Sequence, residues 1–149
     1  MKTIYTDGSC KGNPGPGGWA VVMIDDSQTL QKYGGFDPDT TNNRMEISAA
    51  IAALKLLDRN ESATIFTDSE YVKLGITQWL KNWKMKGWKT ANKKSVKNQD
   101  LWQALDELNH SGIIWKYVAG HSGNDYNELC DQIAKGMIDA QGLGTDLLK

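Results

Sequence analysis

The chain has 149 residues, which fits one domain with a sizeable core, and its hydrophobic content of 40% is ordinary for a globular protein. We find no apolar run long enough to span a membrane and no visible signal peptide, so the cytoplasm is the expected location. Two distant cysteines, Cys10 and Cys130, lack metal-ligand spacing and are expected to be reduced.

The net charge of −1 argues by itself against a nucleic-acid partner, but the charge is unevenly distributed. Residues 71–99 contain eight lysines and no acidic residue, so this segment carries +8 and the rest of the chain carries −9. Such a molecule can present one basic surface to a polyanion while its acidic part performs another task.

The first 36 residues are predicted to form an antiparallel meander. Strands are expected around residues 4–6, at 17–23 and at 30–36, and residues 37–41 are expected to form a loop with capping residues. The glycine-rich segment 11–18 lacks the Gly-Lys-Ser/Thr of a phosphate-binding P-loop and is interpreted as a hairpin turn.

Helices and single strands alternate in the remaining chain. The expected elements are helix 43–58, strand 63–66, helices 69–76 and 77–85, basic loop 89–97, helix 98–108, strand 113–118 and helix 126–140. We therefore predict an α/β fold, a five-stranded mixed sheet in which a three-strand antiparallel meander joins parallel strands flanked by helices. Residues 1–149 are expected to form a single domain with a frayed tail at 141–149.

Two apolar runs end in the same Thr-Asp pair, one at Asp7 and one at Asp68. If the runs form neighbouring strands, the two carboxylates come close together and favour a bound cation. Each acid also has a purely structural alternative, since Asp7 could open an Asx-turn at the strand exit and Asp68 could cap the next helix.

Three further polar residues could reach the same edge of the sheet. Glu46 follows Asn43 at the capping-box spacing, and Asp131 lies beside the inward face of the last helix, where it could equally be a solvated acid. His121 lies in a glycine-flanked loop and could simply be exposed, although an ordinary pKa near ~6.5 suits proton transfer.

Several sequence blocks resemble the signature blocks of ribonuclease H type 1, the bacterial ribonuclease HI family. The similarity runs from Thr3 to about Asp139 and keeps the family order. The blocks are Thr6-Asp7-Gly8-Ser9, Thr41-Asn42-Asn43-Arg44-Met45-Glu46, Thr67-Asp68-Ser69, Gly120-His121 and Asn127-Glu128-Leu129-Cys130-Asp131.

This resemblance implies a ribonuclease H-like fold and an endonuclease that hydrolyses the RNA strand of RNA/DNA hybrids, leaving 5′-phosphate and 3′-hydroxyl ends. It further implies a metal site formed by Asp7, Glu46, Asp68 and Asp131, with His121 assisting proton transfer or product release. Oxygen ligands of this kind suit two Mg²⁺ ions, with Mn²⁺ as a substitute, and two ions can clamp an in-line phosphodiester displacement.

The resemblance also implies substrate contacts. A basic protrusion would grip the DNA strand, two residues would hold a DNA phosphate, and others would lie near the ribose 2′-hydroxyl groups, which distinguish RNA from DNA. The residues of the protrusion are Trp79, Trp83, Lys84, Lys86, Trp88 and Lys89. The two residues at the DNA phosphate are Thr41 and Asn98. The residues near the 2′-hydroxyl groups are Gly8, Ser9, Asn13, Asn42 and Glu46. We expect a monomer without an obligate protein partner.

Three residues depart from the family pattern and lower the positive charge of the expected interface: Asp39, Glu70 and Met85. Two other functions were weighed. A transposase, integrase or resolvase of the same fold usually carries extra domains, for which this chain has no room, and a binding module that lost the chemistry would retain hybrid binding without cleavage.

Overall fold

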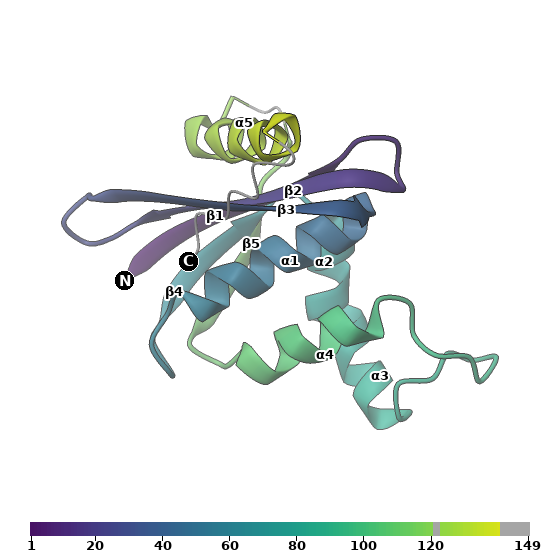
Figure 1. Ribbon diagram of the computed structural model, residues 1–149. Helices are drawn as coiled ribbons and strands as arrows, with labels where there is room; N and C mark the ends of the chain where they lie inside the picture. The colour runs from purple at the N-terminus through teal and green to yellow at the C-terminus, as the bar shows by residue number, and fades with distance from the viewer. Residues whose placement is uncertain (121–122, 141–149) are drawn as a thin grey trace.

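The computed structural model describes residues 1–120 and 123–140, so the predicted fraying of 141–149 and the position of His121 lie outside the described residues. One sheet in the order β3-β2-β1-β4-β5 runs through the molecule (Figure 1). Its strands are β1 (Lys2–Cys10), β2 (Gly15–Ile24), β3 (Leu30–Thr40), β4 (Ala63–Thr67) and β5 (Ile113–Tyr117). The meander β1-β2-β3 is antiparallel, whereas β4 runs parallel to β1 and β5, which confirms the predicted fold class.

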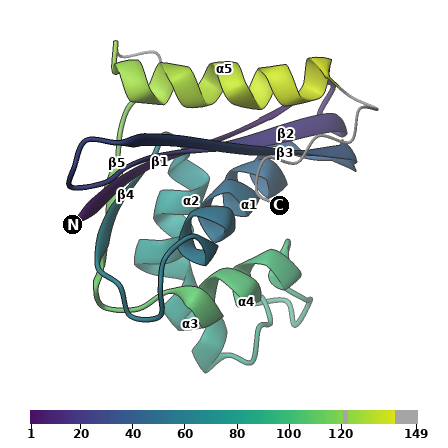
Figure 2. The ribbon, with the colours of Figure 1, turned by 60° about the vertical axis from the view of Figure 1, so that its left-hand side comes forward.

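The helices cover the two faces of the sheet unequally (Figures 1 and 2). Helix α5 (Asp125–Asp139) lies alone on one face, where it packs on β1, β2 and β3. The opposite face carries α1 (Asn42–Lys55), α2 (Glu70–Leu74), the π-helical turn η1 (Gly75–Trp79), α3 (Leu80–Met85) and α4 (Gln99–Leu108). Within the described residues, none of these helices has the length and apolar character needed to cross a membrane.

The main core lies between the sheet and α1. Ile4 and Ile65 project from the central strands onto Ile47 and Ala50 of α1, and all four side chains are fully buried. Helix α1 is buried around much of its circumference because α4 packs on its outer side, with Trp102 completely enclosed. This packing fixes α1 against β1, the strand that carries the first acidic residue of the candidate site.

Several element boundaries differ from the sequence prediction, and α1, for example, ends at Lys55 rather than at residue 58. The predicted loop at 37–41 is wrong, because β3 continues through Pro38 to Thr40. Strand β3 is at the edge of the sheet, where a proline lacking an N–H group is tolerated. The two predicted helices at 69–76 and 77–85 form a nearly continuous helical run from Glu70 to Met85, interrupted by the turn η1.

The apolar residues of α4 are buried to different depths. Trp102 and Leu105 are fully buried, but Leu108 at the end of the helix is 37% exposed. The basic loop is confirmed between α3 and α4, where an isolated bridge joins Lys89 to Ser95.

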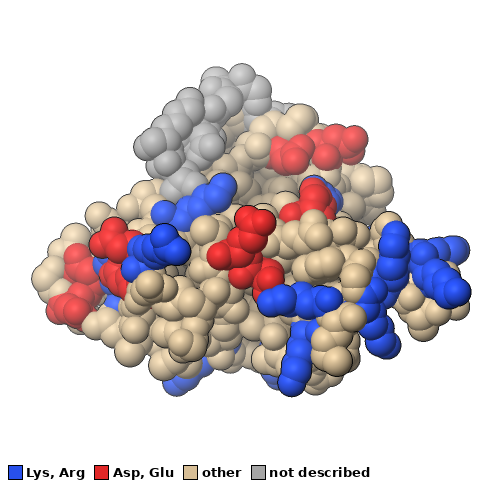
Figure 3. Space-filling view, turned by 90° about the horizontal axis from the view of Figure 1, so that it is seen from below, with Lys and Arg blue, Asp and Glu red and all other residues tan. Residues whose placement is uncertain are grey.

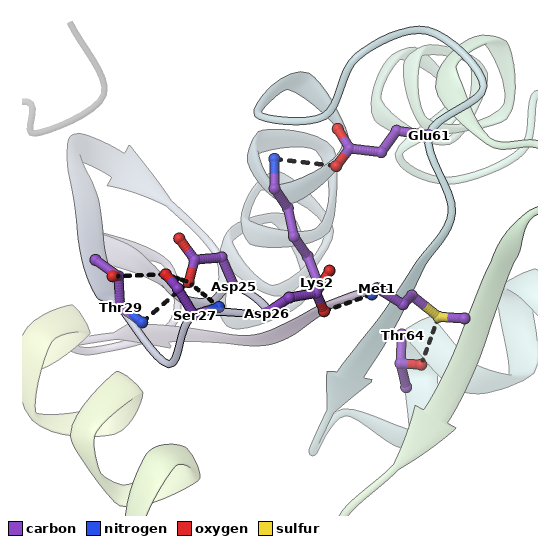
Figure 4. A network of polar contacts seen from close by, with 8 residues as sticks. All are labelled: Met1, Lys2, Asp25, Asp26, Ser27, Thr29, Glu61 and Thr64. Carbon is purple, nitrogen blue, oxygen red and sulfur yellow. Dashed lines mark hydrogen bonds and ion pairs between the residues drawn. The ribbon is translucent and has the colours of Figure 1, made fainter.

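A polar network closes the end of the sheet at which β1 begins (Figure 4). The Met1 ammonium group donates to Asp26, and Lys2 pairs with Glu61 at 3.0 Å, which joins β1 to the loop before β4. Asp25 orders the β2–β3 turn by accepting from the backbone N–H groups of Ser27 and Thr29. These contacts stabilise the end of the sheet at which β1 begins, which lies away from the carboxyl ends of β1 and β4.

Candidate functional site

The site begins with the pairing of β1 and β4. Their parallel register places Thr6 opposite Thr67, so the two Thr-Asp pairs stand side by side. Asp7 lies inside β1, which extends to Cys10, and Asp68 follows directly after β4. The Asx-turn alternative for Asp7 is therefore wrong, because the strand does not end there.

Glu46 reaches this point because α1 packs directly on β1. A Cβ atom added to Gly8 would lie 2.4 Å from the Glu46 backbone nitrogen, so only glycine permits this close approach. The Gly8 N–H donates to Asp7 Oδ1 at 2.9 Å and to Glu46 Oε1 at 2.6 Å, which holds the two carboxylates on a shared donor.

Other residues take the capping roles that were alternatives for the acids. Thr41 caps α1, accepting from the Arg44 N–H at 3.2 Å, and Ser69 caps α2, accepting from the Val72 N–H at 3.1 Å. The cap alternatives for Glu46 and Asp68 are therefore wrong, and both side chains remain available to the cluster.

Asp7, Glu46 and Asp68 each offer a carboxylate oxygen, and these oxygens lie within 4.8 Å of one another. Asp7 and Glu46 are only 3% and 7% exposed. Two buried oxygens, Asp7 Oδ2 and Asp68 Oδ1, have no hydrogen-bond donor among the described residues. Buried, unpartnered carboxylate oxygens in an all-oxygen set fit a hard divalent cation, which would supply the missing charge.

The electrostatics of the cluster agree with this fit. Burial, followed by the charge of Asp68, raises the pKa of Asp7 to about 8. Burial, followed by the charge of Asp7, also raises the pKa of Glu46 well above its usual range. A bound cation would offset the burial and the mutual repulsion that raise the pKa values of these acids.

Asp131 lies beside the cluster rather than within it. Its charge contributes to the raised pKa of Asp7, so the two acids are near each other. Asp131 Oδ2 pairs with Lys135 Nζ at 3.0 Å, one turn further along α5. Lys135 was not predicted as a partner, although an acid and a lysine four residues apart on a helix commonly form an ion pair.

The loop after β5 approaches the same site. A Cβ atom added to Gly120 would lie 3.4 Å from Asp68 Oδ2, so the Gly120 backbone is next to this carboxylate. His121 follows immediately in the sequence, but it lies outside the described residues.

The residues expected near the RNA strand lie on β1, in the β1–β2 loop and at the start of α1. Gly8 and Ser9 continue β1 past Asp7, and Asn13 lies in the β1–β2 loop. The Asn13 Oδ1 atom accepts from the Asn42 N–H at 2.9 Å, which ties this loop to the start of α1. Their roles in substrate binding remain predictions.

The tryptophans of the protrusion form a connected aromatic cluster. Ring centroids are 5.7 Å apart for Trp79–Trp83, 6.3 Å for Trp83–Trp88 and 5.6 Å for Trp83–Trp102. The three protrusion rings are half-buried, so they support this segment and still present surface. Trp79 and Trp83 border a mainly apolar cavity of about 250 Å³, which is also lined by Tyr71, Thr90, Val96 and Lys97.

The basic segment forms one surface. All eight lysines of residues 71–99 are exposed. Figure 3 shows blue side chains gathered at the side where Figure 1 places α3 and the loop leading to α4. The uneven charge of the sequence thus becomes a basic surface on one side of the molecule, including Lys84, Lys86 and Lys89.

A polar network between α1 and α4 was not expected from the sequence. The Arg44 guanidinium group donates to both Asp100 oxygens, at 3.0 and 2.8 Å, and to Asn98 Oδ1 at 3.3 Å. Asn98 in turn donates to the Tyr71 hydroxyl group at 3.1 Å. Nothing in the linear sequence indicated this pairing, because it depends on how α4 packs against the start of α1.

Comparisons with known proteins agree with this architecture. Residues 1–139 match the family described as RNase H. A ribonuclease H from Cyanothece sp. is 58% identical over 137 residues, covering 91% of this chain and 87% of the relative. A ribonuclease HI from Pseudomonas aeruginosa is 55% identical over 132 residues, covering 88% of each chain.

Solved structures show the same fold. LC9-RNase H1, described as a type 1 RNase H with the type 2 active-site motif, has a TM-score of 0.82 at 28% identity, over 99% of this chain and 74% of that chain. LC11-RNase H1, solved in complex with an RNA/DNA hybrid, has a TM-score of 0.68 at 23% identity, over 93% of this chain and 97% of that chain. At the latter identity the likeness shows the fold alone.

Proposed function

The chain belongs to the ribonuclease H family, and we propose on this basis that it is an endonuclease that hydrolyses the RNA strand of RNA/DNA hybrids, leaving 5′-phosphate and 3′-hydroxyl ends. The observation that carries the proposal is the cluster of Asp7, Glu46 and Asp68, whose oxygens lie within 4.8 Å of one another at the middle of the sheet. Such a cluster is costly to bury and is explained by a bound cation.

We propose that Asp7, Glu46, Asp68 and Asp131 hold two Mg²⁺ ions, which Mn²⁺ can replace. When bound, these ions supply positive charge that favours deprotonation of the attacking water and stabilises the leaving 3′ oxygen. The chain itself fixes the ligands, because the Gly8 N–H holds Asp7 and Glu46 in place before metal arrives. Asp131 Oδ2 pairs with Lys135, so Asp131 would bind metal through Oδ1 or by giving up this ion pair.

His121 is proposed to assist proton transfer or product release, which suits a histidine whose ordinary pKa is near ~6.5. Its position next to Gly120, whose backbone lies beside Asp68, supports this proposal. The enzyme should tolerate its loss better than the loss of a carboxylate.

Substrate binding is proposed to divide between two surfaces. The region around the cluster, with Gly8, Ser9, Asn13, Asn42 and Glu46, would meet the ribose 2′-hydroxyl groups of the RNA strand. The exposed lysines and half-buried tryptophans of the protrusion would follow the DNA strand, with Trp79, Trp83, Lys84, Lys86, Trp88 and Lys89 in contact. Thr41 and Asn98 would hold one DNA phosphate.

We further propose that residues 1–149 form a single domain that acts as a monomer in the cytoplasm. One continuous sheet with helices on both faces supports the single domain. Sedimentation equilibrium of the purified chain would test the monomer, and a concentration-dependent mass would reject it.

The activity is tested with a labelled RNA strand that is paired with DNA, paired with RNA or left single. Each substrate is incubated with Mg²⁺ or with EDTA, using the unmodified protein and Asp7→Asn. The proposal predicts cleavage of the hybrid alone, with Mg²⁺ alone and by the unmodified protein alone. Tight hybrid binding without cleavage in Mg²⁺ or Mn²⁺ would reject the enzyme and favour a binding module.

A further inference from the structure

Arg44 connects the two residues that are proposed to hold a DNA phosphate. Its backbone N–H donates to Thr41 Oγ1 at 3.2 Å, and its guanidinium group donates to Asn98 Oδ1 at 3.3 Å. Thr41 is the N-cap residue of α1, and Asn98 is the N-cap residue of α4. The two residues are 57 positions apart in the sequence. Arg44 therefore contacts both residues, Thr41 through its backbone and Asn98 through its side chain.

The Asn98 side chain is held from both of its ends. Its oxygen accepts from Arg44, and its nitrogen donates to the Tyr71 hydroxyl group, which also accepts from Trp102 Nε1 at 3.2 Å. The backbone of Asn98 is left-handed, with φ 60°, a conformation that asparagine tolerates better than most residues. The orientation of the amide is thus determined by its partners on α1 and in the aromatic cluster.

Asp100 completes the arrangement by holding Arg44. Both of its oxygens accept from the guanidinium group, and Arg44 in turn holds the pKa of this carboxyl below its usual range. A bidentate pair fixes the plane of a guanidinium group, which a lysine ammonium group cannot reproduce. The bidentate contact with Asp100 therefore fixes the orientation in which the Arg44 guanidinium group donates to Asn98.

Thr41 and Asn98 are the N-cap residues of α1 and α4, and the Arg44 side chain reaches from α1 to Asn98. The amino end of a helix carries a partial positive charge, which attracts phosphate. In α1 the N–H groups of Asn42 and Arg44 already donate to Asn13 and Thr41, so a phosphate here would depend on the two cap side chains. A phosphate held between the two caps requires that the caps keep a fixed spacing.

We propose that Arg44 is a positioning residue, which aligns Thr41 and Asn98 for a phosphate of the DNA strand through its bidentate contact with Asp100. The inference rests on the proposed function. Arg44 would thus influence the affinity for the hybrid although its guanidinium group contacts Asn98 and Asp100 of the protein itself.

Four proteins test it: the unmodified protein, Arg44→Lys, Arg44→Met and the control Lys2→Met. Lys2 also forms a half-buried ion pair, with Glu61 at 3.0 Å, at the far end of β1. Hybrid affinity, KM and kcat are measured for each. We expect both Arg44 variants to raise Kd and KM about fivefold, the effect of losing about one hydrogen bond, with kcat within about twofold. Lys2→Met should leave all three values unchanged.

Arg44→Lys distinguishes a positioning role from a simple effect of charge, because lysine keeps the positive charge but cannot form the bidentate contact with Asp100. Binding by Arg44→Lys equal to that of the unmodified protein would overturn the inference and leave the proposed function standing. Failure of the unmodified protein to bind the hybrid would overturn both.

A double-mutant cycle with Asn98→Gly provides the second measurement, because glycine accepts φ 60° and removes only the amide. If Arg44 acts through Asn98, Arg44→Lys should have little further effect on Kd in the Asn98→Gly background. Fully additive effects would overturn the inference. In NMR spectra, the Asn98 side-chain amide signal should shift in Arg44→Lys and stay in place in Lys2→Met, and an unmoved signal in Arg44→Lys would also overturn it.

Discussion

Asp7→Asn is predicted to stabilise the metal-free protein while abolishing its activity. Asp7 is 3% exposed, and its Oδ2 atom has no donor among the described residues. Asparagine keeps an acceptor for the Gly8 N–H, which lies 2.9 Å from Asp7 Oδ1, and removes the charge that burial disfavours. The substitution therefore removes a cost of folding without removing a side chain from the core.

The size of this cost follows from the pKa. The pKa of Asp7 rises from 3.8 to about 8 on folding, so between these pH values the folded state holds a proton that the unfolded chain has released. The contribution of Asp7 to the free energy of unfolding is therefore most favourable below about pH 4. It falls by about 1.4 kcal/mol per pH unit between about pH 4 and pH 8. The whole interval sets an upper limit of about 6 kcal/mol, and we expect about 2–4 kcal/mol at pH 8, because Glu46 and Asp68 share the repulsion.

Urea unfolding in EDTA at pH 5 and pH 8 measures the effect. Asp7→Asn should exceed the unmodified protein in unfolding free energy by about 2–4 kcal/mol at pH 8 and by less than about 2 kcal/mol at pH 5. Asp139→Asn is the matched control, since its side chain is 73% exposed and its change should stay within about 0.5 kcal/mol at both pH values.

Equal stabilisation of Asp7→Asn at pH 5 and pH 8 would refute the reasoning, because the cost would then not arise from ionisation. A variant less stable than the unmodified protein at pH 8 would refute it more directly. It would show that the Asp7 charge is favourable in the folded chain even without metal.

Three further predictions follow from the same structure. Saturating Mg²⁺ should raise the melting temperature of the unmodified protein more at pH 8 than at pH 5, where metal must displace protons, and equal shifts in calorimetry would contradict a carboxylate site. Gly75→Ala should cost about 3 kcal/mol of unfolding free energy, because its Cβ would lie 2.0 Å from the buried Trp102 ring, whereas Gly136→Ala, with no atom within 4 Å, should be neutral or stabilising in the same denaturation assay. The double variant Glu70→Gln, Asp39→Arg should bind hybrid more tightly than the unmodified protein at low salt, and equal affinities would show that these acids lie outside the interface.

Much of the fold was predictable because the strands carry strong local signals. Apolar runs bounded by glycine, proline and aspartate placed all five strands, and the helices between the later strands required them to be parallel. The errors fell where tertiary context overrides local preference. Asp37-Pro38-Asp39 reads as a loop in isolation, yet the edge position of β3 allows the strand to continue through it.

The candidate site was predictable in part. The repeated Thr-Asp pair indicated that Asp7 and Asp68 could meet, and the β1–β4 register brings Thr6 opposite Thr67. The place of Glu46 was not decidable from spacing, because residue 46 fits both a helix cap and a site facing β1. That choice depends on the close approach of α1 to Gly8, which is a property of packing.

The helix caps leave the buried acids free from any structural role at the helix ends. Thr41 and Ser69 satisfy the first turns of α1 and α2, so neither helix needs Glu46 or Asp68 to begin. The Gly8 N–H then contacts Asp7 and Glu46, while Asp7 Oδ2 and Asp68 Oδ1 have no hydrogen-bond donor among the described residues. The cluster is thus assembled by residues that carry no charge, and its repulsion is retained in the metal-free fold. That retained repulsion is what a divalent cation relieves, so the features that lower stability also provide the affinity for metal.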